Sequence, residues 1–200
     1  MLAIILARND VREFDQIISL YTREKGKLEL LAKGIKKIVS KNSSNGEVLS
    51  CVDVEVAQGK EVDYLTKVHP AVLFKGIYAD FDKIFLASYI AKMVNEHILV
   101  EEKDIRIFEL LFSFLEFLNK EEKINSLNLA AAFIFKFWYF LGLSPEQEPY
   151  QQWLRLTWEE VNLLPAAAGE DVKNYLNAYQ FAQIQSGKKL ANFIENGRII

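Results

Sequence analysis

The sequence predicts an α+β protein in which a five-stranded antiparallel barrel precedes an all-helical domain. Residues 1 to 75 alternate apolar and polar side chains and are interrupted by turn residues, whereas from about residue 78 apolar residues recur every three or four positions. Half of the 200 residues are hydrophobic, which is enough for the core of one large domain or two small ones. Because the period changes between these two regions, we predict domains at residues 1–76 and 77–200.

Five segments of the first domain have strand character. In VDVEV, residues 52 to 56, strict alternation gives one buried and one solvent-exposed face. Two glycine-containing segments, 23–26 and 58–61, are predicted to be hairpin loops, since glycine readily adopts positive φ. The predicted strands are Leu2–Ala7, Gln16–Tyr21, Lys27–Ala32, Val48–Val56 and Val62–Val68. No long helical pattern separates them, so a parallel βαβ sheet is excluded and a small barrel of the OB type is the natural closure.

Helical periodicity and helix boundary signals define the second domain. Asn125 and Ser126 supply a helix start, Gly142 supplies a stop, and TWEE at residues 157–160 matches a capping box. The predicted helices are Ala79–Leu99, Ile105–Leu118, Leu127–Leu141 and Glu170–Ser186. We therefore expect the second domain to be all-helical.

Positive charge is concentrated in one stretch of a chain whose formal net charge is -3. The cations are Arg23, Lys25, Lys27, Lys33, Lys36, Lys37 and Lys41. Some lie in a hairpin loop and the others follow the end of the next strand, so we expect both groups at one mouth of the barrel. There they would hold the phosphates of single-stranded nucleic acid, with Tyr21 and Tyr64 as stacking platforms. The alternative interpretation is that lysines near turns are simply solvated.

The same stretch resembles the RecO family of bacterial DNA repair proteins. Residues 15–41, DQIISLYTREKGKLELLAKGIKKIVSK, are similar to the family pattern "(L/F)TREHGKL…AKGARRPKSR". The matching positions are Thr22, Arg23, Glu24, Gly26, Lys27, Leu28, Ala32, Lys33, Gly34 and Ser40. More loosely, FIFKFWYFLGLSP at residues 133–145 is similar to the family's helix ending in "LLGFxP", and SGKKL at 186–190 occupies the place of a segment before the final helix.

The resemblance implies a mediator of homologous recombination built from an OB barrel and a helical domain. Such a protein would bind single- and double-stranded DNA, anneal strands, and with RecR load the recombinase RecA on DNA coated by single-strand binding protein. The implied phosphate contacts are Arg23, Lys25, Lys27, Lys33, Lys36, Lys37 and Lys41, with Gly34 letting the chain approach the backbone. The helical domain would receive the C-terminal tail of single-strand binding protein, for which the available cations are Lys136, Arg155, Lys188 and Lys189.

The chain also departs from the family. Many members carry a four-cysteine zinc module after the "LGFxP" helix, whereas residues 146–170 contain no cysteine, so we expect no zinc and no other cofactor. Ile38 and Val39 interrupt the basic run, and lysines replace arginines at three positions. Because lysine lacks the bidentate fork of arginine, general attraction is expected rather than tight phosphate geometry.

The sequence offers no catalytic constellation. His69 and His97 have no metal-ligand partner at helical spacing, and the single cysteine, Cys51, is predicted to be a small core residue. Phosphate-binding GxxxxGK[ST] and nucleophile GxSxG patterns do not occur. Charged residues follow the first six apolar ones, so no signal peptide is expected. We predict a non-enzymatic protein of the cytoplasm, associated with the nucleoid and not with a membrane. The alternative function is a protein-interaction scaffold whose basic patch binds an acidic partner rather than DNA.

Overall fold

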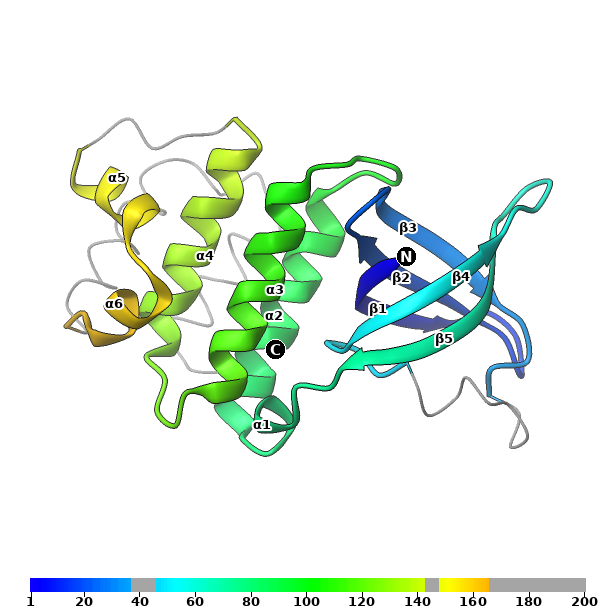
Figure 1. Ribbon diagram of the computed structural model, residues 1–200, viewed down its shortest axis with the longest axis horizontal. Helices are drawn as coiled ribbons and strands as arrows, with labels where there is room; N and C mark the ends of the chain where they lie inside the picture. Colours follow the sequence, from blue (N-terminus) through cyan, green and yellow to red (C-terminus); the bar gives the residue numbers. More distant parts are fainter. Residues whose placement is uncertain (37–45, 143–147, 166–200) are drawn as a thin grey trace. The chain divides into compact units, whose positions relative to one another are not determined.

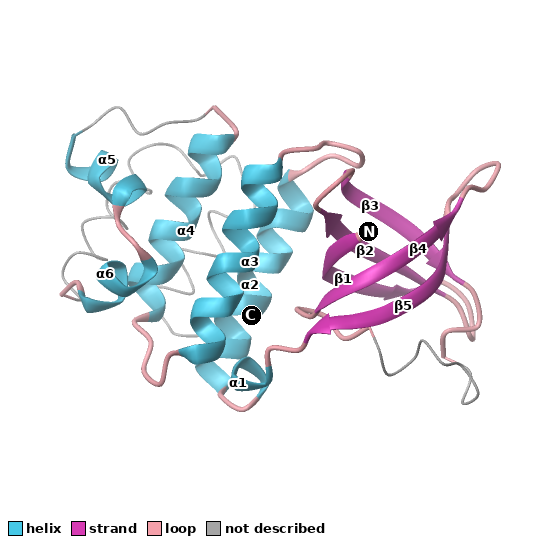
Figure 2. Ribbon diagram, viewed as in Figure 1, coloured by secondary structure: helices cyan, strands magenta, loops and turns pink. Residues whose placement is uncertain are grey.

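The computed structural model describes residues 1–36, 46–142 and 148–165, and the chain divides into two compact units, residues 1–120 and 121–200. The first unit contains five strands and three helices, and the second contains three described helices (Figures 1 and 2). Lys37, Lys41, Lys188 and Lys189 lie outside the described residues, as does the predicted helix Glu170–Ser186.

Five strands close into a barrel in the order β1-β2-β3-β5-β4, which confirms the predicted architecture. The strands are β1 (Leu2–Asp10), β2 (Gln16–Thr22), β3 (Gly26–Ala32), β4 (Cys51–Ala57) and β5 (Tyr64–Val72). All neighbouring pairs are antiparallel except β3 and β5, which meet in parallel where Leu31 pairs with Tyr64. This single parallel contact brings the start of β5 beside the end of β3.

Among the strand boundaries that differ from the prediction, two have a clear local reason. β4 begins at Cys51 rather than Val48, because residues 47–50 form a turn. Leu49 has a φ of 71°, and the amide of Ser50 donates to the carbonyl of Glu47 at 3.2 Å. β1 continues to Asp10 through a register shift between Ile5 and Ala7, as expected where a bulge adds a residue to one strand.

The barrel interior is filled by aliphatic side chains from every strand. Its buried cluster consists of Ala3, Ile5, Ile18, Leu20, Leu28, Leu30, Ala32, Ile35, Val52, Val54, Leu65 and Val68. Cys51 is fully buried, which confirms its predicted place in the core, and burial raises the pKa of its thiol to about 11.

Three helices complete the first unit: α1 (Lys75–Tyr78), α2 (Phe81–His97) and α3 (Ile105–Lys120). Asp80 caps α2 by accepting a hydrogen bond from the amide of Lys83 at 3.0 Å. α2 packs against β1 and α3, while the amide of Gly76 in α1 donates to the side chain of Asn119 near the end of α3. These helices belong to the same compact unit as the barrel, and the division at residues 76 and 77 stays a prediction.

The second unit is built around α4 (Ser126–Phe140), with α5 (Glu148–Arg155) and α6 (Trp158–Leu163) packed against it. The predicted capping box is confirmed, since Thr157 and Glu160 each accept a hydrogen bond from the backbone amide of the other. Phe133, Phe135 and Phe137 are fully buried. Within the described residues, none of the helices combines the length and apolar character needed to span a bilayer.

Candidate nucleic-acid interface of the barrel

The structure divides the basic stretch between the two ends of β3. Arg23 and Lys25 precede β3, and Lys33 and Lys36 follow it. Seven strand residues separate the two groups, a distance of about 20 Å at about 3.3 Å per residue. The expectation that both groups share one mouth of the barrel is therefore wrong, because an extended strand carries them to opposite ends.

Lys27 is buried at the hairpin end of β3. Its ammonium group donates to the carbonyl oxygens of Asn95 at 2.5 Å and Ile98 at 3.1 Å, and it lies 3.7 Å from a carboxylate oxygen of Glu29. Only 7% of Lys27 is exposed. Because the two carbonyls belong to the C-terminal end of α2, Lys27 neutralises the negative end of that helix. This corrects its predicted role: the ammonium binds the helix rather than facing a ligand.

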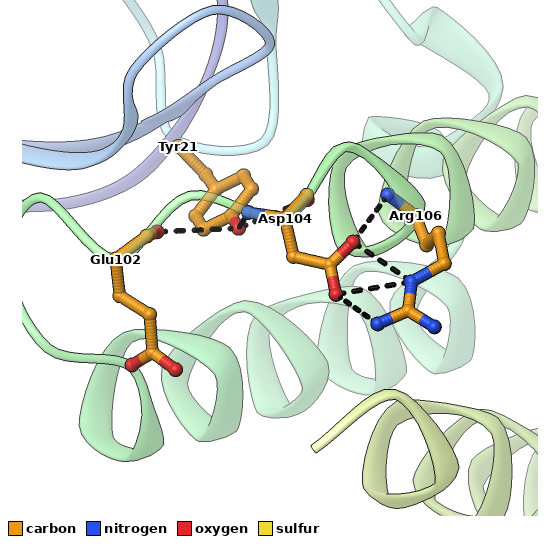
Figure 3. A network of polar contacts seen from close by, with 4 residues as sticks. All are labelled: Tyr21, Glu102, Asp104 and Arg106. Atoms are coloured by element: carbon orange, nitrogen blue, oxygen red, sulfur yellow. Dashed lines mark hydrogen bonds and ion pairs between the residues drawn. The ribbon is translucent and has the colours of Figure 1, made fainter. Parts of the chain in front are cut away.

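Tyr21 lies at the same end of β3 and is fully buried. Its hydroxyl donates to the carbonyl oxygen of Asp104 at 3.1 Å and accepts a hydrogen bond from the amide of Asp104 at 3.0 Å (Figure 3). The carbonyl oxygen of Glu102 is 3.4 Å away. Burial raises the pKa of Tyr21, so its phenol keeps its proton. The prediction that Tyr21 serves as a stacking platform is wrong, since no face of the ring reaches solvent.

The loop between α2 and α3 covers the β2–β3 hairpin. The amide of Glu101 donates to the carbonyl of Lys27 at 2.7 Å, and the amide of Lys27 donates to the carbonyl of Glu102 at 3.4 Å. Gly26 has a φ of 74°, and a Cβ atom there would lie 2.0 Å from the Glu102 carbonyl oxygen. Arg23 pairs with Glu109 of α3 at 3.0 Å, while Lys25 is exposed. Most of the β2–β3 hairpin thus contacts the α2–α3 loop and α3 and is not available to a ligand.

The opposite end of the barrel is formed by three segments, residues 10–15, 33–36 and 58–64, which we call the distal surface. The amide of Gly34 donates to Oδ1 of Asp15 at 2.7 Å, and the amide of Lys36 donates to the carbonyl of Phe14 at 3.2 Å. On its other side, Lys33 places its ammonium 4.6 Å from the centre of the Tyr64 ring. The turn at 33–36 therefore lies between the two other loops and is held by both.

Cations of the distal surface are partly paired with carboxylates. Nζ of Lys36 lies 2.8 Å from Oδ2 of Asp10, and a guanidinium nitrogen of Arg12 lies 3.9 Å from Oδ2 of Asp15. The hydrogen bond from Lys36, followed by that from Gln16, lowers the pKa of Asp10. Pairs this exposed are weak and screened by salt, so an incoming phosphate can compete for both cations.

Sequence reasoning missed two residues of the distal surface, Arg12 and Phe14. The side chain of Arg12 is 74% exposed and Phe14 is 41% exposed. An available signal was the pairing of an aromatic residue with a cation in the short polar segment between two predicted strands.

Comparison with known families accounts for both parts of the chain. Residues 1–74 match the family model described as recombination protein O N terminal, and residues 78–149 match that described as recombination protein O C terminal. The chain belongs to the RecO family. The basic stretch and the barrel fall within the first match, and α2 to α4 fall within the second.

Relatives named DNA repair protein RecO align with large parts of the chain. That of Geobacter metallireducens is 32% identical over 124 residues, covering 62% of this chain and 51% of the relative. The protein of Desulfitobacterium hafniense is 24% identical over 143 residues, covering 72% and 51%, and that of Caldanaerobacter subterraneus is 29% identical over 143 residues, covering 70% and 54%. The chain thus spans about half the length of these curated RecO relatives.

Two of the cations predicted for partner binding are described in the second unit. Lys136, inside the RecO C-terminal match, donates from Nζ to the carbonyl oxygens of Leu154 at 2.9 Å and Leu156 at 2.8 Å. Its ammonium also lies 5.4 Å from the centre of the Trp158 ring, and burial lowers its pKa. Arg155 is exposed at the end of α5. Lys136 therefore stabilises the end of α5, whereas the Arg155 side chain faces solvent.

The zinc expectation for this RecO-family chain concerns a region that is only partly described. Among the residues that the structure describes, no three His, Cys, Asp or Glu side chains are grouped so that they could hold a metal ion. Nδ1 of His97 lies 2.8 Å from the carbonyl oxygen of Met93 within α2, and His69 is exposed on β5.

Proposed function

We propose that this chain is a DNA repair and recombination mediator that binds single-stranded DNA on the distal surface of its barrel. The observation that carries the proposal is the turn at residues 33–36, which presents Lys33 and Lys36 between two loops of a RecO-family barrel. OB barrels bind oligonucleotides through the loops beside this part of the sheet. Sequence-independent contacts to phosphate suit a mediator, which has to act on any damaged site.

The proposed DNA site consists of Lys33, Gly34, Lys36, Lys37 and Lys41. Arg23 and Lys25 lie at the other end of β3, so a strand that also reaches them has to cross about 20 Å of the barrel. Site sizes of roughly 4 to 16 nucleotides per OB fold are sufficient for this path. Lys27 is left out, because its ammonium is buried against α2.

On this proposal the protein anneals complementary strands and acts with RecR to load RecA on DNA coated by single-strand binding protein. The second unit would receive the tail of single-strand binding protein, with Arg155, Lys188 and Lys189 as the proposed cations. Binding and annealing need no nucleotide and no metal, since charge neutralisation and base pairing supply the free energy. Support for this part comes from membership of the RecO family.

The decisive experiment measures the affinity of the protein for a fluorescent single-stranded oligonucleotide over a range of salt concentrations. We expect a steep decrease with salt, and loss of most binding in the double variant Lys36→Glu, Lys37→Glu. A matched control is Lys92→Glu, Lys120→Glu, which changes the net charge equally at exposed positions of α2 and α3. Unchanged binding by the first variant, or an equal loss in the control, would remove the distal surface from the proposal.

Mediator activity requires a second measurement. Annealing of complementary strands is compared with and without single-strand binding protein, and then with that protein lacking its C-terminal tail. We expect annealing of bare strands and of strands coated by the full single-strand binding protein, and no annealing of strands coated by the protein that lacks its tail.

The rival function is a scaffold that binds an acidic protein. Its supporting observation is that Asp10 and Asp15 already neutralise part of the distal surface by pairing with Lys36 and Arg12. A scaffold would show no salt-dependent affinity for oligonucleotides.

A further inference from the structure

Phe14 is a large apolar side chain displayed on an ordered loop. The loop closes on itself, because the amides of Val11 and Arg12 both donate to the carbonyl of Asp15, at 3.2 and 3.4 Å. It is also tied to the next turn by the bond from the amide of Lys36 to the carbonyl of Phe14. With 41% of Phe14 exposed, the loop presents the ring at a defined position on the barrel surface.

Tyr64 is a second aromatic ring, on the other side of the turn at 33–36. It begins β5, is half-buried, and pairs in register with Leu31 of β3. The Lys33 ammonium lies 4.6 Å from its centre. A cation in that position is attracted to the ring face but stays exchangeable at the surface, so phosphate can draw it away and leave the ring face to a base.

The two rings are joined by adjacent strands. Phe14 lies two residues before the start of β2, which pairs with β3 along its length, and Tyr64 lies against the far side of β3. Strand spacing of about 4.8 Å places β2 and β5 about 10 Å apart across β3. Each ring has a cation in its own or the neighbouring segment: Arg12 belongs to the same loop as Phe14, and the Lys33 ammonium lies over the Tyr64 ring.

We propose that Phe14 and Tyr64 form a stacking platform for the bases of single-stranded nucleic acid, flanked by Arg12, Lys33 and Lys36 as phosphate contacts. This inference rests on the proposed function and adds that the protein contacts the bases of the nucleic acid as well as its phosphates. Stacking uses the π-face that every base possesses, so binding tolerates any sequence. Paired bases in a duplex are stacked on one another, so the platform discriminates in favour of single strands.

The cations of the distal surface indicate that Phe14 and Tyr64 bind nucleic acid rather than a protein. Three basic side chains belong to the same surface as the two aromatic ones, and this is the combination that single-strand-binding grooves use. An apolar protein segment carries no anion that could compete with the Asp10 and Asp15 carboxylates for Lys36 and Arg12, whereas a phosphate does. Binding of such a segment in place of DNA would contradict the proposal.

The test uses the full chain and oligonucleotides that contain the fluorescent base 2-aminopurine. Phe14→Leu and Tyr64→Leu keep apolar volume but remove the rings. We expect each to weaken single-strand affinity by between about 5-fold and about 100-fold and to reduce 2-aminopurine quenching, with duplex affinity within twofold of wild type. Phe14→Trp and Tyr64→Phe, which keep an aromatic face, should retain wild-type single-strand affinity.

Phe81→Leu is the matched control, because Phe81 is 80% exposed on α2 of the same unit. It should change neither affinity nor quenching. The platform would be overturned if the leucine variants weakened single-strand and duplex binding equally, or if they left quenching unchanged. In either case, single-strand binding by the wild-type protein would leave the proposed function intact. If the wild-type protein does not bind single strands at all, the proposed function fails first.

Discussion

Tyr21 and Asp104 exchange hydrogen bonds through one hydroxyl group, which donates to the Asp104 carbonyl at 3.1 Å and accepts from the Asp104 amide at 3.0 Å. Tyr21 belongs to strand β2 of the barrel, and Asp104 lies in the loop before α3. The pair therefore joins β2 to the helices of the same unit. The side chain of Arg106 holds the Asp104 carboxylate and lowers its pKa (Figure 3). The stretch that resembles the family's DNA-binding motif, residues 15–41, therefore also contains a residue whose role is to attach the barrel to the helices.

Tyr21→Phe should destabilise the protein without changing its fold. The variant keeps the buried ring but leaves the Asp104 amide without its acceptor, which costs about 1–3 kcal/mol. Urea unfolding should show a lower midpoint with an unchanged slope. Tyr139→Phe is the control, since Tyr139 is 48% exposed and its change should stay within about 0.5 kcal/mol. Equal stability of both variants would mean that water replaces the Tyr21 hydroxyl.

Stability should also decrease at alkaline pH, in part through Tyr21. Burial raises the pKa of Tyr21 above 10.0, so its stabilising contribution is complete below pH 10 and is lost as pH rises through the folded-state pKa. Burial also raises the pKa values of Tyr78, to about 12, and of Tyr89. Unfolding free energies measured from about pH 9 to about pH 11 should therefore fall in wild type and fall less steeply in Tyr21→Phe. If the unfolding free energy decreased with pH equally steeply in wild type and in Tyr21→Phe, Tyr21 would not be one of the groups responsible.

Lys27→Met should lower stability and leave DNA affinity nearly unchanged. The methionine fills a similar volume but removes a charged donor from the carbonyls of Asn95 and Ile98, which costs about 1.5–3 kcal/mol. Lys25→Met is the control, because Lys25 is exposed in the same hairpin and should change stability by less than about 0.5 kcal/mol. A stable Lys27→Met protein with weakened single-strand binding would show instead that this ammonium contacts DNA.

Asp10→Asn should strengthen binding to single-stranded DNA. The substitution releases Lys36 from its carboxylate partner and removes one negative charge from the distal surface. Because the pair is exposed, the expected gain is about two- to fivefold at low salt and shrinks as salt is added. Glu55→Gln, which breaks the comparable Lys67 pair between β4 and β5, should leave affinity unchanged. Similar gains in both variants would indicate net charge rather than the distal site.

Cys51 should report the opening of the barrel. The single thiol of the chain is fully buried, and its pKa is raised to about 11, so in the folded protein it should resist thiol reagents near neutral pH. Labelling should be at least about a thousandfold slower than in urea, as expected for a stability above roughly 5 kcal/mol. Lys27→Met should accelerate labelling. Fast labelling of the native wild-type protein would mean that β4 opens locally.

Most of the fold could be predicted from local patterns. Period-two alternation located the five strands, and the boundary signals located α4 and the capping box of α6. The boundaries that differ, such as the start of β4 at Cys51, depend on a turn whose positive φ falls on Leu49, a residue with no turn signal. α1 and α5 were missed because helices of four and eight residues are too short to establish a helical period in the sequence.

The candidate site was only partly predictable. Lys33, Gly34 and Lys36, which the resemblance implied as phosphate contacts, lie on one turn of the distal surface, and their role stays a prediction. Phe14 and Arg12 join them through pairing between β2 and β3. That proximity depends on which strands become neighbours, and residue types within one segment do not reveal it.

Residue periodicity was enough to predict the barrel and the helices, because strand and helix periods are properties of short segments. The family was indicated separately, by the resemblance of residues 15–41 to its motif. The tertiary structure decided which cations face solvent. It buried Lys27 and Tyr21 against the α2–α3 loop and carried Lys33 and Lys36 to the other end of β3. The physical reason is that burial and hydrogen bonding to distant backbone groups determine whether a charge is available to a ligand, and both arise only when separate segments pack together.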